Sequence, residues 1–583
     1  MPQGACTRMA RIRKVEIRNF RSVRALDWFP GPGVNCLIGP GDSGKSTILD
    51  AIDFCLGARR TAAISDTDFH NLDVGQAISI TLTLGALPDA LQNLDTYGDF
   101  LRSYHAGTRV IEEEPQHGWE TVLSVNVLVG ADLEPVWTLI SSQAQAAGIE
   151  RGLRWADRVS IAPARLGNYL NAHLGWTRGS VLNRLSDDAV QLGPQLAQAA
   201  RQARASFGQA ASEPLRQVLD EVNRQAQELG ISVGQQGAQA LLDAHSVSLG
   251  DGAVALHNDA GVPLRSLGTG SARLLIAGLQ RAAFKDQAGI VLVDEAETGL
   301  EPHRLQRLLI SLGAKDPAAP MQVFLTTHSP VAVRELDAEQ IWVVRTEGVQ
   351  HEARWAGEFA EAQGTARATP EALLAKTVIL CEGASEVGLV RGLDMYWVEQ
   401  NHRSLLSAGA IAVSVGGSFP EKGFQRGLAL RSLGYKTIVL VDSDKPINPG
   451  DVATHVAAGG RHIQWDADRA TEHELFMSLD HGGVAELLER AIELHGRQVI
   501  DDQIRTRTNG QWTLEAIDET SLSDGFDSQL RQELGSVAHK SGWFKQQGIV
   551  EDLARDIIGP RFAQTAAPFQ QHIRNLFSWA HEH

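Results

Sequence analysis

A short glycine-rich segment near the N-terminus has the spacing of a phosphate-binding loop. It reads GPGDSGKS from Gly39 to Ser46 and fits the pattern G-x-x-x-x-G-K-[ST]. Glycines in such a loop let the backbone bend so that its N–H groups point at phosphate oxygens. A helix that begins here adds the positive end of its dipole. The segment predicts an ATP site whose glycine contacts are Gly39, Gly41 and Gly44.

The residues that end this loop supply polar side chains. Lys45 is expected to reach the β- and γ-phosphates, and Ser46 to be a ligand of Mg²⁺. Thr47 is a further candidate contact to ATP. The flanking elements fit this role, because residues 34–38 read as a short buried strand and residues 46–56 as an amphipathic helix.

Two later apolar strands end in residues that suit the same chemistry. Residues 290–302 read IVLVDEAETGLEP, so four apolar residues lead into Asp294 and Glu295. We expect Asp294 to hold Mg²⁺ and Glu295 to polarise the attacking water as general base. Residues 322–330 read QVFLTTHSP and place His328 after the next strand, where it would contact the γ-phosphate. A lone histidine is usually structural, but this position favours a functional one.

The segment 266–279, SLGTGSARLLIAGL, resembles the signature segment of ABC-type ATPases. The resemblance implies that it caps the γ-phosphate held by another subunit, through Gly268, Gly270 and Ser271. The match is imperfect, because Gly268 stands where the family has a serine and Thr269 where it has the first glycine.

The first strands complete the resemblance to an ATPase head. Residues 11–29 predict two antiparallel strands, and residues 78–85 and 121–129 predict two more. Strands followed by the phosphate-binding loop resemble the start of SMC- and RecF-type ATPases. The ordered motifs therefore resemble an ABC-type head over about residues 10–350.

Two other residues of the head each allow two interpretations. Gln76 is either a glutamine-loop residue facing the nucleotide or, more in keeping with its surroundings, a plain loop residue. Residues 160–167 look like a strand ending in Pro-Ala-Arg. Arg165 in that strand either faces the nucleotide or lies at the surface.

A second group of acids follows strands later in the chain. Glu382 ends an apolar strand that begins at Thr377, and Asp442 and Asp444 follow the strand at 437–441. Acids at the carboxyl edge of parallel strands in an α/β unit lie where ligands are expected. Oxygen ligands of this kind suit Mg²⁺ or Mn²⁺.

Further acids extend this second group. Glu386 falls four residues after Glu382, on the predicted helix. Either Glu472 or Glu474, in ATEHELF, would complete a second metal position; otherwise they cap a helix. Glu-Gly after one strand and Asp-x-Asp after a later one resemble the Toprim domain.

An ABC-type head with a compact helical insertion, followed by Toprim, resembles the OLD (overcoming lysogenization defect) nuclease family, including the nuclease of Gabija-type anti-phage systems. The resemblance implies two metal ions and a lysine supplied late in the chain. Lys545, in HKSGWFK, is the first choice and Lys540 the second. It also implies DNA as substrate and a helicase as a partner to be tested.

Two functions remain open at this point. The first is an ATP-regulated, metal-dependent DNA endonuclease that uses a two-metal Toprim mechanism, in phage defence or DNA processing. The alternative is a non-catalytic, RecF- or SMC-like DNA clamp gated by nucleotide. The number of acids favours the nuclease, because a binding module does not need them. A transporter ATPase is disfavoured by the absence of an apolar run of about 18 residues.

Length and composition set the remaining expectations. A chain of 583 residues predicts several domains: the ATPase head in two parts (1–167 and 246–365), a helical insertion for dimerisation or for packing on its own head (168–245), and Toprim (371–583). Four dispersed cysteines and the lack of a signal peptide favour the cytoplasm. A net charge of −17 means that any DNA contact needs locally clustered Lys and Arg. The signature segment predicts a homodimer or a higher even-numbered assembly.

Overall fold

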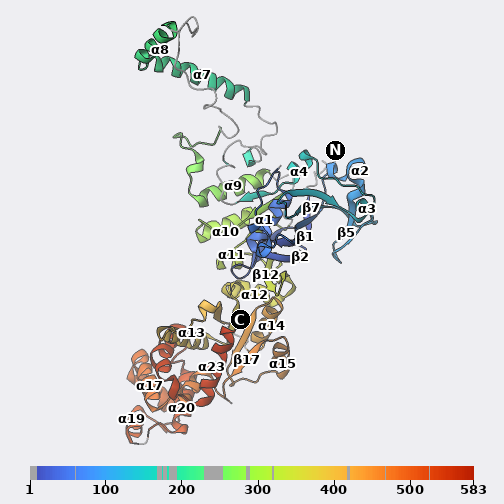
Figure 1. Ribbon diagram of the computed structural model, residues 1–583. Helices are drawn as coiled ribbons and strands as arrows, with labels where there is room; N and C mark the ends of the chain where they lie inside the picture. The colour runs from blue at the N-terminus through green and yellow to red at the C-terminus, as the bar shows by residue number, and fades with distance from the viewer. Residues whose placement is uncertain are drawn as a thin grey trace, which may run out of the picture.

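The computed structural model is an α/β protein with an N-terminal head and a smaller C-terminal domain (Figure 1). It describes residues 10–59, 61–166, 174, 180–182, 193–228, 254–283, 289–317, 321–416, 420–466, 468–523 and 525–582. The predicted α/β fold class is confirmed, because a mixed 13-stranded sheet forms the head and a four-stranded sheet forms the second domain.

One part of the large sheet is an antiparallel lobe in the order β6-β5-β7-β4-β1-β2, with β8 on β7. Its strands are β1 (Arg11–Phe20), β2 (Val23–Trp28), β4 (Ile78–Gly85), β5 (Leu101–His105), β6 (Val110–Glu112), β7 (Glu120–Val129) and β8 (Pro135–Ile140). The four predicted antiparallel strands are present here. In β1 the burial alternates along much of the strand, which is the pattern of a sheet with one face on the core.

The other part of the large sheet carries the motifs. Its strands are β3 (Val34–Ile38), β9 (Ala164–Leu166), β10 (Ile290–Val293), β11 (Gln322–Thr326), β12 (Ile341–Glu347) and β13 (Gln350–Trp355). The order β12-β3-β11-β10-β9 is parallel throughout. Strands β3, β10 and β11 are fully buried, as their mainly apolar sequences predict.

Helices lie along both parts of the large sheet (Figure 1). They are α1 (Lys45–Leu56), α2 (Leu94–Tyr97), α3 (Ser142–Ala146), α4 (Trp155–Ile161), α9 (Thr269–Ala283), α10 (Pro302–Ser311), α11 (Pro330–Glu335) and α12 (Ala360–Ala368). The strand expected at 160–167 is shorter than predicted. Helix α4 continues to Ile161, and Pro163 separates it from β9, because proline cannot donate to either ladder.

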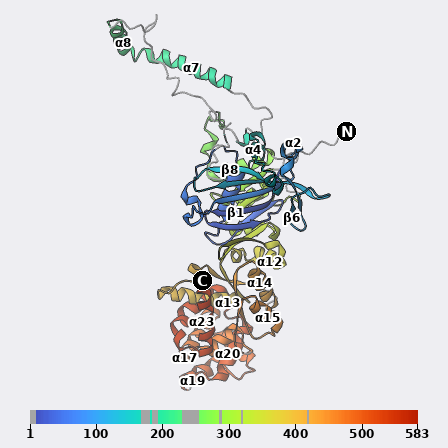
Figure 2. The same cartoon turned by 45° about the vertical axis from the view of Figure 1, so that its right-hand side comes forward.

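Helices α7 (Gly193–Ser212) and α8 (Arg216–Glu228) project away from the head in both ribbon views (Figures 1 and 2). They are the described part of the predicted insertion, and the rest of residues 168–245 lies largely outside the described residues. Leu215, Val218 and Val222 are exposed. These apolar side chains therefore do not pack on the described part of the head.

The polar sequence of residues 350–370 predicts an irregular linker between the two domains, but this stretch is regular structure. Strand β13 and helix α12 occupy it, and one apolar cluster continues from the head through Ala362 and Leu373 to Val378 and Tyr435. The polar sequence misled the prediction because β13 and the short amphipathic helix α12 are each only partly buried. The two domains share a core.

The C-terminal domain contains a parallel sheet in the order β15-β14-β16-β17. Its strands are β14 (Thr377–Cys381), β15 (Ala410–Ser414), β16 (Lys436–Val441) and β17 (Arg461–Gln464), joined by α13 (Ala384–Glu399), α14 (Glu421–Ser432) and α15 (Pro449–Ala457). The chain moves from β14 to β15 on one side and then to β16 on the other. This reversal is a topological switch point, where ligands bind in open α/β sheets.

Helices complete the domain with a second apolar cluster around Phe476, Trp543 and Phe544. They are α16 (Thr471–Ser478), α17 (His481–His495), α18 (Arg497–Arg507), α19 (Leu514–Ser523), α20 (Ser528–Ser541), α21 (Gln547–Leu553), α22 (Gly559–Arg561) and α23 (Ala567–His581), with a π-helical turn at Ala554–Ile558. Across the described ranges, none of the helices has the length and apolar character needed to cross a membrane.

Candidate nucleotide and metal sites

The phosphate-binding loop lies between β3 and α1, as predicted. Gly39 has φ +150°, and a Cβ there would lie 2.5 Å from the carbonyl oxygen of Val344 in β12. Gly44 has φ +89°, and a Cβ there would lie 2.9 Å from Val23. Only glycine fits either position, so the loop's shape is fixed by strands on both sides. Gly41 faces open space.

Lys45 is buried beneath this loop. Its Nζ donates to the carbonyls of Gly39 (3.1 Å) and Pro40 (2.7 Å) and to Ser43 Oγ (3.2 Å). Burial lowers the pKa of Lys45, although nearby Asp42 opposes the shift. The ammonium group is therefore held inside the loop that would surround the phosphates. Thr47, two residues on, hydrogen bonds with Ser22 Oγ at 2.8 Å.

Asp294 joins the loop to the strand-end residues. Its Oδ1 accepts from Ser46 Oγ (2.9 Å) and from Thr326 Oγ1 (2.6 Å). The backbone N–H of Glu295 donates to the same Thr326 hydroxyl at 2.8 Å. Ser46 and Asp294, the two predicted Mg²⁺ ligands 248 residues apart in sequence, are thus in direct contact. Hydroxyl and carboxylate oxygens are the donors that Mg²⁺ prefers.

Glu295 and His328 stand at the exposed edge of this arrangement. Glu295 has φ +46°, an uncommon conformation for a residue with a side chain, and its carboxylate accepts from Thr298 Oγ1 at 3.1 Å. The backbone N–H of His328 donates to Glu297 at 2.8 Å, and Thr327 donates to the same carboxylate at 2.6 Å. Glu297, which the sequence analysis did not single out, therefore fixes the turn that carries His328.

Arg165 is half-buried and faces the site. It pairs with Asp50 at 2.5 Å, and its guanidinium lies 3.9 Å from Asp294. Asp50 and Asp53 follow Ser46 by about one and two helical turns, so all three share a face of α1. A cavity of about 460 Å³ adjoins this face, lined by Arg59 and Arg165 together with Phe20, Phe54 and residues 61–64. Its size lies within the range of ligand pockets.

The signature segment opens α9, as predicted. Gly270 packs so closely on the turn after β10 that a Cβ would lie 2.2 Å from the carbonyl oxygen of Gly299, whereas Gly268 faces open space. Ser271 Oγ accepts from Arg304 at 3.0 Å. Arg273, missed in the sequence, donates to the backbone carbonyl of Glu295 at 2.7 Å.

Gln76 lies in an exposed turn just before β4. Its backbone carbonyl accepts from the side chain of Asn19, and its N–H donates to Asp73 O at 3.2 Å. These are contacts of the backbone and fit either interpretation of the side chain.

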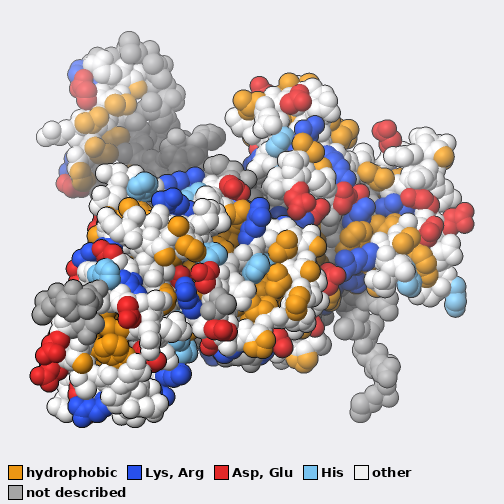
Figure 3. All heavy atoms as spheres, turned by 90° about the horizontal axis from the view of Figure 1, so that it is seen from below, with side chains coloured by type: hydrophobic (Ala, Val, Ile, Leu, Met, Phe, Trp, Pro, Cys, Tyr) orange, Lys and Arg blue, Asp and Glu red, His pale blue; other side chains and the backbone are white. Residues whose placement is uncertain are grey.

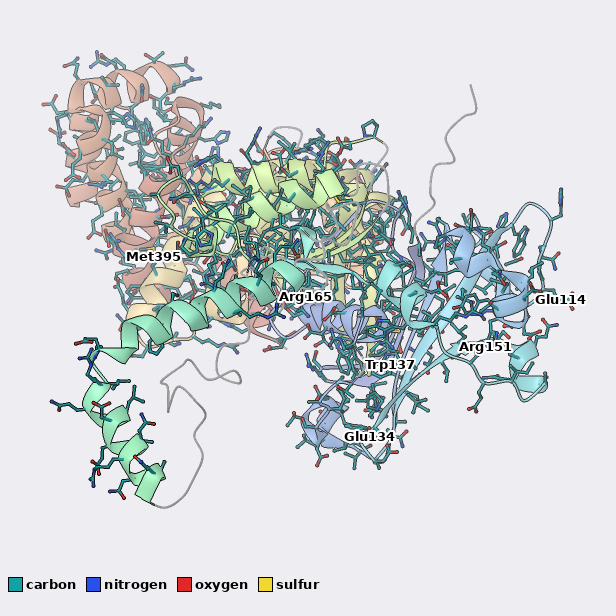
Figure 4. All side chains as sticks on the ribbon, turned by 90° about the horizontal axis from the view of Figure 1, so that it is seen from above. Glu114, Glu134, Trp137, Arg151, Arg165 and Met395 are labelled. Carbon is teal, nitrogen blue, oxygen red and sulfur yellow. The ribbon has the colours of Figure 1, made fainter. Side chains whose placement is uncertain are left out.

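The second group of acids lies in the C-terminal domain. In Figure 4 this domain can be found by the label of Met395 on α13, and the head by the label of Arg165. Glu382 follows β14, and Asp442 and Asp444 follow β16, the two strands that flank the switch point. One ligand oxygen from each of these three carboxylates lies within 4.8 Å of the others. The strand-end acids predicted to share an ion are therefore brought together.

Burial and crowding act strongly on Asp442. Burial and the carboxylates of Glu386, Glu382 and Glu472 raise the pKa of Asp442 to about 9, although Thr471 Oγ1 donates to it at 3.0 Å. The pKa of Glu386 is also raised, mainly by burial. Acids that resist ionisation together suit a divalent cation, since its charge offsets their repulsion. The donor set fits Mg²⁺ or Mn²⁺.

Glu472 and Glu474 point in different directions from α16. Glu472 accepts from Ser385 Oγ at 3.2 Å and from His539 Nδ1 at 3.1 Å, beside the cluster. Glu474 accepts from Arg469 at 2.9 Å and from Ser478 at 2.7 Å. Residues two apart on a helix face different sides. The geometry therefore favours Glu472 as a ligand and gives Glu474 a structural ion pair.

Two residues that the sequence analysis missed contact the cluster. Lys445, directly after Asp444, forms an ion pair with Glu382. His539 lies next to Lys540 in the HKSGWFK segment, but only its lysines were considered. The hydrogen bond to Glu472 raises the pKa of His539, and exposed Lys545 is close enough to oppose this shift; Lys540 is exposed at the end of α20. The sequence offered one signal for each residue. Lys445 directly follows Asp-x-Asp, and His539 directly precedes Lys540.

The first site thus defines a P-loop ATPase with an ABC-type head. Family models agree: one described as "AAA domain" matches residues 14–90, and one described as "AAA domain, putative AbiEii toxin, Type IV TA system" matches residues 168–334. RecF from Desulforamulus reducens is 31% identical over 68 residues, which covers 12% of this chain and 18% of RecF.

The chain is also similar to the OLD nuclease of Thermus scotoductus, at 26% identity over 348 residues. The aligned part covers 55% of this chain and 59% of that nuclease, less than two thirds of its length. The resemblance to OLD nucleases drawn from the motifs is thereby confirmed.

Two solved structures are among those that match the chain, both with low TM-scores. The SMC head domain from Thermotoga maritima covers 59% of this chain and 98% of its own, with 14% identity and a TM-score of 0.28. The structure of the recombination mediator protein RecF covers 60% of this chain and 100% of its own, with 11% identity and a TM-score of 0.31.

Proposed function

We propose that this protein is an ATP-regulated, divalent-metal-dependent DNA endonuclease. The observation that carries the proposal is the convergence of Glu382, Asp442 and Asp444 at the switch point of a parallel sheet that shares a core with a P-loop ATPase. The similarity to an OLD nuclease supports the same assignment. In this proposal the C-terminal domain is a Toprim domain.

The head would bind and hydrolyse ATP slowly. Lys45 and the loop glycines would hold the phosphates, while Ser46 and Asp294 would hold Mg²⁺. Glu295 would accept a proton from the attacking water, and His328 would contact the γ-phosphate. The direct Ser46–Asp294 contact supports this assignment, because it forms only if the loop and β10 are already in register.

In the C-terminal domain, Glu382, Asp442 and Asp444 would hold one ion, and Glu386 and Glu472 would help to hold a second. Such ions supply a water of lowered pKa and stabilise a leaving oxygen. The residues of the chain orient these carboxylates: Thr471 donates to Asp442, and Gly383 N–H donates to Glu386 at 2.7 Å. Lys545 would offset charge that develops on the phosphate.

DNA is the proposed substrate, although the chain is acidic. On the face shown in Figure 3, Lys and Arg side chains are interspersed with Asp and Glu. Contact with phosphates would therefore depend on cations local to the site, of which Lys445, Lys540 and Lys545 are candidates. Localisation in the cytoplasm, a helicase partner and a role in phage defence stay predictions.

A homodimer or a higher even-numbered assembly is proposed on two grounds. Gly268 faces open space, as a segment that caps a neighbour's nucleotide must. The exposed Val218 and Val222 of α8 offer an apolar stripe for a lasting contact. Light scattering at micromolar concentration tests this, and a monomer with and without ATP would rule it out.

Plasmid cleavage tests the nuclease assignment. Supercoiled DNA is incubated with wild type, Asp442→Ala or Asp502→Ala, in Mn²⁺ or Mg²⁺, with and without ATP. Asp502 is an exposed residue of α18, and its variant is the matched control. We expect nicking by wild type and Asp502→Ala only. Thermal melting in EDTA checks folding, and Asp442→Ala should melt no lower than wild type because it relieves carboxylate repulsion. Equal nicking by folded Asp442→Ala would favour a DNA clamp instead.

A further inference from the structure

Helices α16 and α20 approach each other unusually closely beside the carboxylates. The contact is made at Gly535, where a Cβ would lie 2.8 Å from the Cα of His473 and 3.2 Å from its ring. Any larger residue would push α20 away. His539 follows Gly535 by four residues, so it lies on the same face of α20, one turn nearer to the site.

From this position the ring of His539 spans two carboxylates that come from different elements. Nδ1 lies 3.1 Å from Glu472 Oε2 on α16, a hydrogen-bond distance at which Nδ1–H donates. Nε2 lies 3.8 Å from Asp444 Oδ2, after β16. Both contacts are made by one planar ring, whose two nitrogens have a fixed separation.

Glu472 needs such a partner. It is almost fully buried, and the carboxylates of Glu386 and Asp442 act on one another and on it. Its remaining side-chain partner is a single hydroxyl, Ser385 Oγ, at the longer distance of 3.2 Å. Repulsion within the group would turn the carboxylate of Glu472 away, and the hydrogen bond from His539 opposes that rotation.

We propose that His539 is a positioning residue that holds Glu472, and through its second nitrogen Asp444, at the spacing needed to bind divalent metal. The inference rests on the proposed metal site and adds to it a residue outside the ligand set. Partners that orient ligands in this way commonly change metal affinity by about 10–100-fold when removed.

Metal binding without DNA or nucleotide tests the proposal separately from activity. Mn²⁺ is titrated by calorimetry into wild type, Asp442→Ala, His539→Ala, His539→Asn and His539→Gln. His481→Asn, at the start of α17, is the matched control. The amide nitrogen of Asn can occupy the place of Nδ1 and still donate to Glu472, whereas that of Gln falls nearer Nε2.

We expect His539→Ala to bind Mn²⁺ at least about tenfold more weakly, and His539→Asn to stay within about threefold of wild type. His539→Gln should be weaker than His539→Asn, and His481→Asn should match wild type. If His539→Ala does not fold in EDTA, the comparison of the Asn and Gln variants decides.

The outcomes separate the two claims. Loss of Mn²⁺ binding in Asp442→Ala but wild-type binding in His539→Ala would overturn the role of His539 and leave the metal site standing. An Asn variant as weak as the Gln variant would also overturn that role. Wild-type binding in Asp442→Ala would remove the carboxylate site itself and, with it, the proposed nuclease.

Discussion

The guanidinium carbon of Arg345 lies 4.0 Å from the centroid of the Tyr435 ring, and this contact joins the two domains. Arg345 is in β12, directly after Val344, whose carbonyl packs on Gly39 of the phosphate-binding loop. Tyr435 directly precedes β16, and Asp442 directly follows that strand. Each partner is thus one strand away from a candidate site.

Replacing this cation should weaken the junction. Arg345→Met keeps the apolar stem but removes the ring contact and the hydrogen bond to Ala375 O at 3.3 Å. A desolvated cation–π contact stabilises the folded protein by about 2 kcal/mol. Burying the guanidinium charge has a desolvation cost, and the substitution removes this cost as well, so the net loss of stability is smaller. We expect unfolding to be easier by about 1 kcal/mol and the effect of ATP on plasmid cleavage to shrink. Arg307→Met, on exposed α10, should change neither the melting curve nor the ATP effect.

Two glycines of α9 should respond in opposite directions to alanine. A Cβ at Gly270 would meet the carbonyl oxygen of Gly299, whereas one at Gly278 would meet nothing within 4 Å. Gly270→Ala should destabilise by about 1–3 kcal/mol through overpacking. Gly278→Ala should stabilise by about 0.5–1 kcal/mol, because alanine is the better helix former. Urea denaturation measures both, and equal effects would contradict the close contact.

The fold could be predicted where local pattern and chemistry agree. Mainly apolar segments predicted β3, β10 and β11, and the spacing around Lys45 identified the loop that joins β3 to α1. The junction could not be predicted in this way. Its polar sequence around β13 and α12 is buried on one side only, against residues such as Tyr435 that are distant in the chain.

Only part of the candidate metal site could be predicted from the sequence, because the rest depends on residues that are distant in the chain. Strand-end acids follow from sequence, because parallel strands place their carboxyl ends at one edge. Which of Glu472 and Glu474 faces the cluster depends on the rotation of α16, which is set by its packing on α20. His539 and Lys445 reach the acids through tertiary contacts, which their neighbouring residues in the sequence signal but do not determine.

Removal of the proposed general base should separate binding from turnover in the head. Glu295→Gln keeps the size of the side chain and can still hydrogen bond with Thr298, so ATP affinity should hold. Turnover should fall by at least about 100-fold, since general-base catalysis typically contributes 10²–10⁴. Phosphate release and fluorescent nucleotide binding measure the two quantities. Glu339→Gln, exposed and remote from the loop, is the control; turnover surviving in Glu295→Gln would reject the assigned role.

His455 should make the protein sensitive to acid. The side chain is fully buried in the C-terminal domain, its Nε2 hydrogen bonds with Thr437 Oγ1 at 2.8 Å, and its ring packs on Phe424. Burial, with smaller effects of Arg431 and His462, lowers the pKa of His455 from 6.5 to about 4. Below pH 6.5 the unfolded chain therefore binds a proton that the folded protein excludes.

The sign of the effect follows from this difference. Stability contributed by neutral His455 is fully present above pH 6.5 and is lost as the pH falls toward 4, by up to about 3 kcal/mol. His455→Gln, which cannot be protonated and can still bond with Thr437, should lose less stability over that range. Urea unfolding at pH 7, 5.5 and 4.5 measures the slopes, with His402→Gln at an exposed position as control. Parallel slopes for wild type and His455→Gln would show that another group controls the acid response.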